Sequence, residues 1–121
     1  MAKRAQSAKG SRKKQPQWEE RIDETFYLGG RRRGAILKEE AWFERGQVVK
    51  YSLAYMNPRV CAVDNGRVLG YDNSHDVHHR HSMGKTEHLR FSGYEQLVNR
   101  FEREVRELWR LEDEEDGQST A

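Results

Sequence analysis

Apolar and polar residues alternate through the middle of the chain, and this pattern predicts β-strands. In QVVKYSLAYM, the side chains of Val49, Tyr51, Leu53 and Tyr55 share one face, which is clearly more apolar than the other. AILKEEAWF comes before this run, and the turn-like residues Glu44–Gly46 between the two suit a short hairpin. The pattern predicts about five strands in all, over residues 35–43, 47–56, 59–63, 67–71 and 85–91.

Asn65 and Gly66 separate RVCAV from RVLGY and give the strongest local signal for a hairpin. Both residues tolerate a positive φ, which the type I′ turn of a two-residue hairpin requires. We therefore expect the segments 59–63 and 67–71 to pair across this turn. Cys61, in the first of them, is predicted to be a small buried hydrophobic residue. As the only cysteine, it excludes an intramolecular disulfide and a thiolate metal cluster.

The last periodic segment predicts a helix from Tyr94 to about Leu111. Ser92, with Glu95 three residues later, forms a capping-box pattern at its start. Apolar residues then make one stripe at helical spacing, and the opposite face, which includes Glu104, is predicted to be solvated. Strands followed by one packed helix predict an α+β fold with a twisted antiparallel sheet. The stripe consists of Leu97, Val98, Phe101, Val105, Leu108 and Trp109.

The two ends of the chain are predicted to lie outside the domain. The first 17 residues have almost nothing to bury and carry six basic residues and no acidic one, so we predict disorder there. A weak helical pattern follows from Trp18 to Phe26, although a short strand after Asp23 fits nearly as well. The predicted organisation is a basic arm (1–17), a single α+β domain (18–111) and an acidic tail (112–121).

Composition narrows the classes of function. Only 35% of the 121 residues are hydrophobic, so one modest core is the limit, and the net charge of +2 hides a basic start and an acidic end. The basic arm suits nucleic acid, an anionic partner, the chain's own acidic end or simple solvation. No stretch approaches a membrane span, and no apolar segment follows the basic start as in a secretory signal. We therefore expect a cytosolic protein with no membrane partner.

Four of the five histidines lie within YDNSHDVHHRHSMGK, residues 71–85, and three interpretations of this segment are open. Exposed imidazoles can bind a metal or transfer protons near neutral pH. In a metal site they would be joined by Asp72 or Asp76, but the segment has neither an HExxH motif nor a Cys/His spacing. The candidate metal ligands are His75, His78, His79 and His81.

The second interpretation is a site that cleaves RNA. RNA supplies its own nucleophile in the 2′-hydroxyl, so the protein needs a general base, a general acid and cations around the phosphate. His79 and His81 are the candidate acid and base, and Asp72 would orient an imidazole. The candidate phosphate contacts are Arg80, Lys85 and the glycine-flanked Arg31, Arg32 and Arg33.

The third interpretation is a polar loop and partner surface. Asp72 and Asn73 would then close a turn through hydrogen bonds to the backbone, and the arginines would be solvated charge. The three tryptophans, Trp18, Trp42 and Trp109, are expected to fill the core rather than to stack on bases.

The run GRVLGYDNSHDVHHRH, with SLAYMNPRVCAVDN before it and KTEHLRFSGYEQLVNRFEREVREL after it, resembles the TumE-type family of small bacterial proteins. These are toxins of type II toxin–antitoxin modules, encoded beside a helix-turn-helix antitoxin. The resemblance covers roughly residues 35–110. Its most specific part matches an aromatic residue, Asp and Asn ahead of a histidine pair and a further histidine: Tyr71, Asp72, Asn73, His78, His79 and His81.

The resemblance implies a toxin whose helix-turn-helix antitoxin occludes its site. By looser analogy with RelE-like toxins, it suggests RNA as the target. We therefore expect a toxin-like component with endoribonuclease chemistry that needs no metal and no cofactor, at Asp72, His79 and His81. The alternative is a noncatalytic module that binds nucleic acid or a partner through its arm and histidine surface. A homodimer is among the candidate assemblies.

Overall fold

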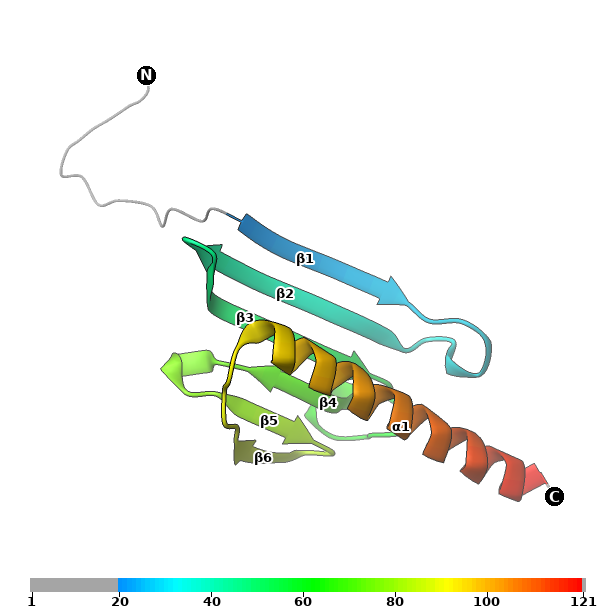
Figure 1. Cartoon of the computed structure of the whole chain (residues 1–121). Helices are drawn as coiled ribbons and strands as arrows, with labels where there is room; N and C mark the ends of the chain where they lie inside the picture. The colour runs from blue at the N-terminus through cyan, green and yellow to red at the C-terminus, as the bar shows by residue number, and fades with distance from the viewer. Residues whose placement is uncertain (1–19, 121) are drawn as a thin grey trace.

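The chain forms one antiparallel sheet followed by a long helix (Figure 1). The computed structural model describes residues 20–120, with side chains up to residue 117, so the predicted basic arm and Trp18 lie outside the described residues. Strand order in the sheet follows the sequence, which confirms the α+β prediction with six strands in place of about five. The elements are β1 (Glu20–Tyr27), β2 (Ile36–Glu44), β3 (Gln47–Met56), β4 (Arg67–Asp72), β5 (His79–Ser82), β6 (Lys85–His88) and α1 (Tyr94–Thr120).

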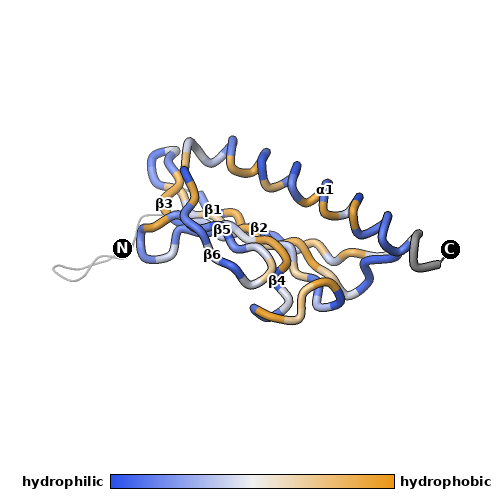
Figure 2. The backbone as a smooth tube through the Cα atoms, turned by 90° about the horizontal axis from the view of Figure 1, so that it is seen from below, coloured by the Kyte–Doolittle hydropathy of each residue, from blue (hydrophilic) through white to orange (hydrophobic). Residues whose placement is uncertain are grey.

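Helix α1 lies against one face of the sheet, here called the covered face, while no described helix lies on the opposite, open face (Figure 2). Three of the four residues in the apolar set predicted from the alternation, Tyr51, Leu53 and Tyr55, are fully buried on the covered face of β3. Val49, the fourth, is exposed, because a register irregularity opposite Trp42 and Phe43 makes Val48 the partner of Phe43. The predicted helix stripe packs onto this face. The core therefore sits between α1 and the middle strands, and side chains of opposite parity face solvent.

Residues 20–27 form strand β1, so the weak helical pattern over this stretch was the wrong interpretation. Ile22 lies opposite Ala41 and Phe26 opposite Leu37 in the register with β2. Ile22 and Phe26 therefore both reach the covered face. They are four residues apart, and this spacing places two side chains on one face of a strand as well as on one face of a helix. Backbone pairing with β2 decides between the two, because a helix here would leave the edge of β2 unpaired.

RVCAV is not a strand, and the predicted hairpin across Asn65 and Gly66 is also wrong. Both residues have the positive φ that was expected, but the turn closes an irregular loop. The Asn57 amide donates to the Gly66 carbonyl, and the Asn57 carbonyl accepts from the Val60 and Cys61 amides. This arrangement buries Cys61, as predicted, while β4 pairs with β3 instead.

Helix α1 begins at Tyr94, as predicted, but its capping and its C-terminal end differ from the prediction. Ser92 does not form the capping box with Glu95; its hydroxyl donates to the Gln96 side chain, and the first helical bond runs from Leu97 N–H to the Gly93 carbonyl. At the other end the helix continues through the acidic stretch to Thr120.

Contacts with the rest of the fold account for this extension of the helix. Glu112 accepts hydrogen bonds from the buried Tyr55 hydroxyl, and Arg32 lies 3.4 Å from Glu112 and 3.1 Å from Asp113. The acidic side chains beyond Leu111 are thus used to fasten the helix to β3 and to the loop after β1.

Candidate functional site

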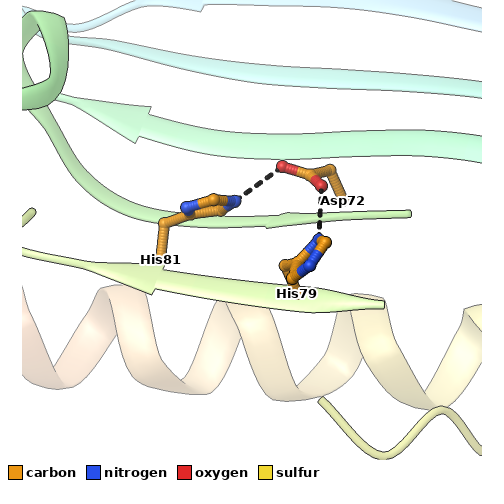
Figure 3. Close-up of side chains that lie close together, drawn as sticks. All are labelled: Asp72, His79 and His81. Carbon is orange, nitrogen blue, oxygen red and sulfur yellow. Dashed lines mark hydrogen bonds and ion pairs between the residues drawn. The ribbon is translucent and has the colours of Figure 1, made fainter. Parts of the chain in front are cut away.

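Asp72, His79 and His81 come together on the open face (Figure 3). Asp72 lies opposite His79 and Gly70 opposite His81 in the β4–β5 register, so all four residues share a face. The His81 Nε2 atom is 2.8 Å from Asp72 Oδ2, and His79 Nδ1 is 3.5 Å from Asp72 Oδ1. One carboxylate therefore bridges two imidazoles, and the structure brings together the three residues predicted to be catalytic.

The Asp72 carboxylate is held at the end of β4 by its neighbours in the chain. The Ser74 amide donates to Asp72 Oδ1 at 3.2 Å. Asn73 continues the pairing with β3 through its side chain, which accepts from Tyr51 N–H and donates to the Val49 carbonyl, both at 3.0 Å. The sequence triplet Tyr71–Asn73 therefore places a rigid carboxylate next to β5.

The environment of Asp72 stabilises its charged form. Partial burial on its own would raise the pKa of Asp72, but the Ser74 amide and the neighbouring His81 outweigh it and hold this pKa below its usual range. Asp72 is therefore ionised near neutral pH. It can orient an imidazole and stabilise the charge that forms when that imidazole takes up a proton.

The two imidazoles differ in how their nitrogens are engaged. His81 contacts Asp72 through Nε2 and Thr86 Oγ1 through Nδ1, at 3.2 Å. His79 contacts Asp72 through Nδ1 only, and among the described residues its Nε2 has no hydrogen-bond partner. His88 lies next to it, with ring centroids 5.9 Å apart. The His79 Nε2 atom can thus meet a ligand directly, while His81 meets one through Nδ1 only by exchanging its contact with Thr86.

Arg67 belongs to this site, although sequence reasoning missed it. Its Nη1 lies 3.7 Å from Asp72 Oδ2, and its Nε lies 2.8 Å from Asp64 Oδ2. Met56 pairs with Arg67 and Tyr55 with Leu69, so Val68 is an extra residue in β4. Such a bulge shifts the parity of the strand and turns Arg67 toward the open face.

Gly70 leaves the space that the Arg67 side chain occupies. A Cβ atom on Gly70 would lie 2.6 Å from Arg67 Cδ, closer than two such atoms can approach. Glycine inside a strand often marks the close approach of another group. Gly70 was therefore the signal in the sequence that could have indicated a side chain crossing β4 at this point.

Arg80 and Lys85, predicted to contact phosphate, lie on the covered face and not beside the cluster. Arg80 pairs with Glu87 at 2.8 Å and with Glu104 of α1 at 3.3 Å. Lys85 lies opposite Ser82, and the side chain of Ser82 is on the same face of β5 as that of Arg80. Both residues are close to the histidines in sequence, but strand alternation separates them from the site.

The arginines 31–33 lie near the C-terminal half of α1. The Arg32 guanidinium stacks on the Trp109 ring at 4.7 Å and donates to the Trp109 carbonyl, in addition to its ion pairs with the helix. Arg31 lies 3.6 Å from Asp113. Arg33 is exposed. The structure therefore does not bring these arginines to the histidines, and Arg32 fastens the helix.

Two of the four histidines predicted as metal ligands lie away from the site. His78 is on the covered side, where its ring stacks on Phe91 at 4.3 Å and its Nδ1 contacts the Tyr51 hydroxyl at 2.9 Å. His75 is exposed, in a short 3₁₀ turn with a positive φ. Among the described residues, the donors that could jointly hold a metal ion are Asp72, His79 and His81, whose ligand atoms lie within 4.8 Å of one another.

The tryptophans divide between the two faces. Trp109 packs edge-on against Tyr55, as expected for a core residue. Trp42 is on the open face, where Arg21 and Lys50 lie 5.0 and 5.1 Å from its ring, so the prediction that it fills the core was wrong. Cationic and aromatic side chains therefore share the open face with the histidine cluster.

The carboxylate of Asp72 should make folding stability sensitive to acid. A group with a lowered pKa in the folded state stabilises the fold above its unfolded pKa, and that stabilisation is lost as the pH falls through the folded value. Urea unfolding at pH 7 and at pH 3 should therefore show a smaller loss of stability for Asp72→Asn than for the wild type. An equal loss in both proteins would show that Asp72 is not stabilised as described.

Comparison with known proteins gives one match. A family model described as Toxin TumE matches residues 17–109, which is more than half of the chain and includes the whole sheet. No curated protein and no solved structure matches the chain significantly. None of the helices in the described part of the chain combines the length and the apolar character needed to cross a membrane.

Proposed function

The chain belongs to the TumE toxin family, which makes it the toxin component of a toxin–antitoxin system, and we propose that it cleaves RNA at the Asp72–His79–His81 cluster. The observation that carries the proposal is the bridging of two imidazoles by one ionised carboxylate on an open face. A carboxylate at Nδ1 of His79 leaves Nε2 to exchange a proton with a ligand, as in other acid–base sites.

The reaction needs no group beyond the cluster and the RNA. One imidazole removes the proton of the 2′-hydroxyl, and O2′ forms a bond to phosphorus as the bond to the 5′-oxygen breaks. The second imidazole gives its proton to that leaving oxygen, so the products are a 2′,3′-cyclic phosphate and a 5′-hydroxyl. We assign these steps to His79 and His81, and Asp72 orients them.

The cations on the open face replace those expected from the sequence. Arg67 lies beside Asp72, and Lys50 is on the same face two residues along β3 from Ser52, which lies opposite Asp72. A guanidinium and an ammonium in these positions suit the phosphate whose charge increases in the transition state. We therefore propose Arg67 and Lys50 as phosphate contacts, in place of Arg80 and Lys85.

A divalent metal site is the second candidate, because two imidazoles and a carboxylate within 4.8 Å are a common donor set. The guanidinium of Arg67, 3.7 Å from Asp72 Oδ2, opposes this assignment, since it already supplies positive charge to the carboxylate. Cleavage that persists in EDTA would favour acid–base chemistry. Loss of cleavage in EDTA and its recovery with Mn²⁺ or Zn²⁺ would favour the metal.

Expression in a bacterial host tests the proposal. The wild type should arrest growth and fragment cellular RNA, and the double variant His79→Ala, His81→Ala should do neither at equal protein level. Replacement of His75 and His78 is a poorer control because His78 packs against Phe91, so the exposed His75→Ala is the matched variant and should remain toxic. Growth arrest by the double variant would remove the cluster from the mechanism, and intact RNA during wild-type arrest would favour a noncatalytic binding module.

A further inference from the structure

A groove runs along α1 on the covered face, because the helix crosses β3 and β4 (Figure 1) and covers β1 and β2 only in part. Three adjoining hollows form it, and the largest has a volume of about 490 Å³. We call it the β1–β2 groove. Its apolar lining comes from Ile22, Phe26, Leu37, Phe43, Val98 and Phe101.

One large apolar side chain in this groove is strongly exposed. Phe26 is 51% exposed, whereas Ile22 and Leu37 on the same face are partly buried against the core. The stripe of α1 that covers β3 thus continues sideways into a surface that the described chain covers only in part. Contiguous apolar surface of this kind is typical of an interaction site.

Two acidic side chains also lie at the groove. Glu24 of β1 lies directly opposite Glu39 of β2, and both side chains are on the covered face. Like charges placed opposite each other on a sheet destabilise it. Glu39 accepts a hydrogen bond from Tyr94, but among the described residues neither carboxylate has an ion-pair partner. A cation between these two glutamates would relieve their repulsion.

The partly covered strip over β1 and β2 has about the width of one helix. Two neighbouring strands extend over about 10 Å, which is close to the distance between the axes of packed helices. We propose that an amphipathic helix of the antitoxin lies in the β1–β2 groove beside α1, with an apolar stripe on Phe26 and Leu37 and a Lys or Arg between Glu24 and Glu39. The antitoxin is the partner that membership of a toxin family implies. This inference does not depend on RNA cleavage.

Two other occupants fit the groove less well. The chain's own residues 1–17 are basic, but they contain no aromatic or large aliphatic residue except the initiator methionine, so they cannot supply the apolar stripe. A second copy in a twofold contact would bring the same glutamates of both chains together. An antitoxin helix in the groove also leaves the open face uncovered, in contrast to the expectation that the partner occludes the histidine site directly.

Neighbouring residues on β1 provide matched controls, because their side chains alternate between the two faces. Glu24→Lys and Phe26→Ala should each weaken binding of the antitoxin encoded beside the toxin by about tenfold or more, as expected for a charge partner and an aromatic anchor. Asp23→Lys and Tyr27→Ala, which change the open face, should alter the affinity less than threefold. Calorimetric titration on the His79→Ala, His81→Ala background measures binding without toxicity.

Three results would overturn the inference. Weaker binding by Asp23→Lys and Tyr27→Ala alone would place the antitoxin on the open face. Unchanged binding by all four variants would remove both faces of β1 from the interface. A wild type that is dimeric by light scattering and becomes monomeric on Phe26→Ala, with antitoxin affinity unchanged, would assign the groove to a second copy. Deletion of residues 1–17 should leave antitoxin affinity unchanged, and an increase would show that the arm competes for the groove.

Discussion

Replacing Glu104 with alanine should destabilise the fold by about 3 kcal/mol, which is far more than a charged residue on a solvated helix face would cost. Its carboxylate accepts a hydrogen bond from the buried Tyr71 hydroxyl and also lies 3.3 Å from Arg80 and 3.2 Å from Arg100. Without Glu104, the fully buried Tyr71 hydroxyl loses its hydrogen-bond acceptor, and the partly buried Arg80 guanidinium loses one of its two carboxylate partners. Urea unfolding at pH 7 measures the loss.

The protonation states of Glu104 and Tyr71 agree with the expected loss of stability. Burial on its own would raise the pKa of Glu104, but the Tyr71 hydroxyl and the Arg80 and Arg100 guanidinium groups outweigh it and hold this pKa below its usual range. The partly buried carboxylate is thus charged and stabilised by its partners. For Tyr71, burial, followed by the hydrogen bond to Glu104, raises the pKa far above its usual value, so its hydroxyl stays a donor.

Glu107, one turn further along α1, is the matched control. It is exposed and pairs only with Arg110 on the same helix, so Glu107→Ala should change the unfolding free energy by less than about 0.5 kcal/mol. Tyr71→Phe combined with Glu104→Ala should cost less than the sum of the two single changes, because the orphaned hydroxyl is then absent. Equal costs for Glu104→Ala and Glu107→Ala would show that the network does not stabilise the fold.

The outline of the fold could be predicted because it depends on local signals. Alternation over residues 47–56 and the turn before it were sufficient to predict the β2–β3 hairpin. Its turn residues Arg45 and Gly46 both have positive φ. The spacing of the apolar stripe was sufficient to predict that the helix packs against the sheet. The errors arose where tertiary contacts decide. Pairing with β2 makes residues 20–27 a strand, and Arg32 extends the helix into the acidic stretch.

The three central residues of the site could also be named from the sequence, because their chemistry is that of an acid–base site and His79 and His81 alternate within one short strand. The cations could not, since their parity depends on register and on a bulge. Arg80 lies between His79 and His81 in the chain and therefore faces the other side. Without the extra residue Val68, strand alternation would place Arg67 on the covered face as well. The bulge at Val68 turns Arg67 toward Asp72 on the open face.

Replacing His79 with alanine should lower the rate of RNA cleavage by about 100- to 10,000-fold, the usual contribution of a general acid or base. His79 keeps one nitrogen on Asp72 and has the other available, whereas both nitrogens of His81 are engaged within the fold. The measurement is the single-turnover rate on a single-stranded RNA oligonucleotide with saturating protein, so that binding and chemistry are separated.

His88 provides the control for this change, because it is an exposed imidazole on the same face beside His79 but does not contact Asp72. His88→Ala should keep the rate within about threefold of the wild type. The pH–rate profile separates the roles further: the wild type should show a rise and a fall set by two imidazoles, and His79→Ala should lose one of these limbs. A folded His79→Ala variant with the wild-type rate and profile would mean that His79 transfers no proton, and the bridged carboxylate would then be structural.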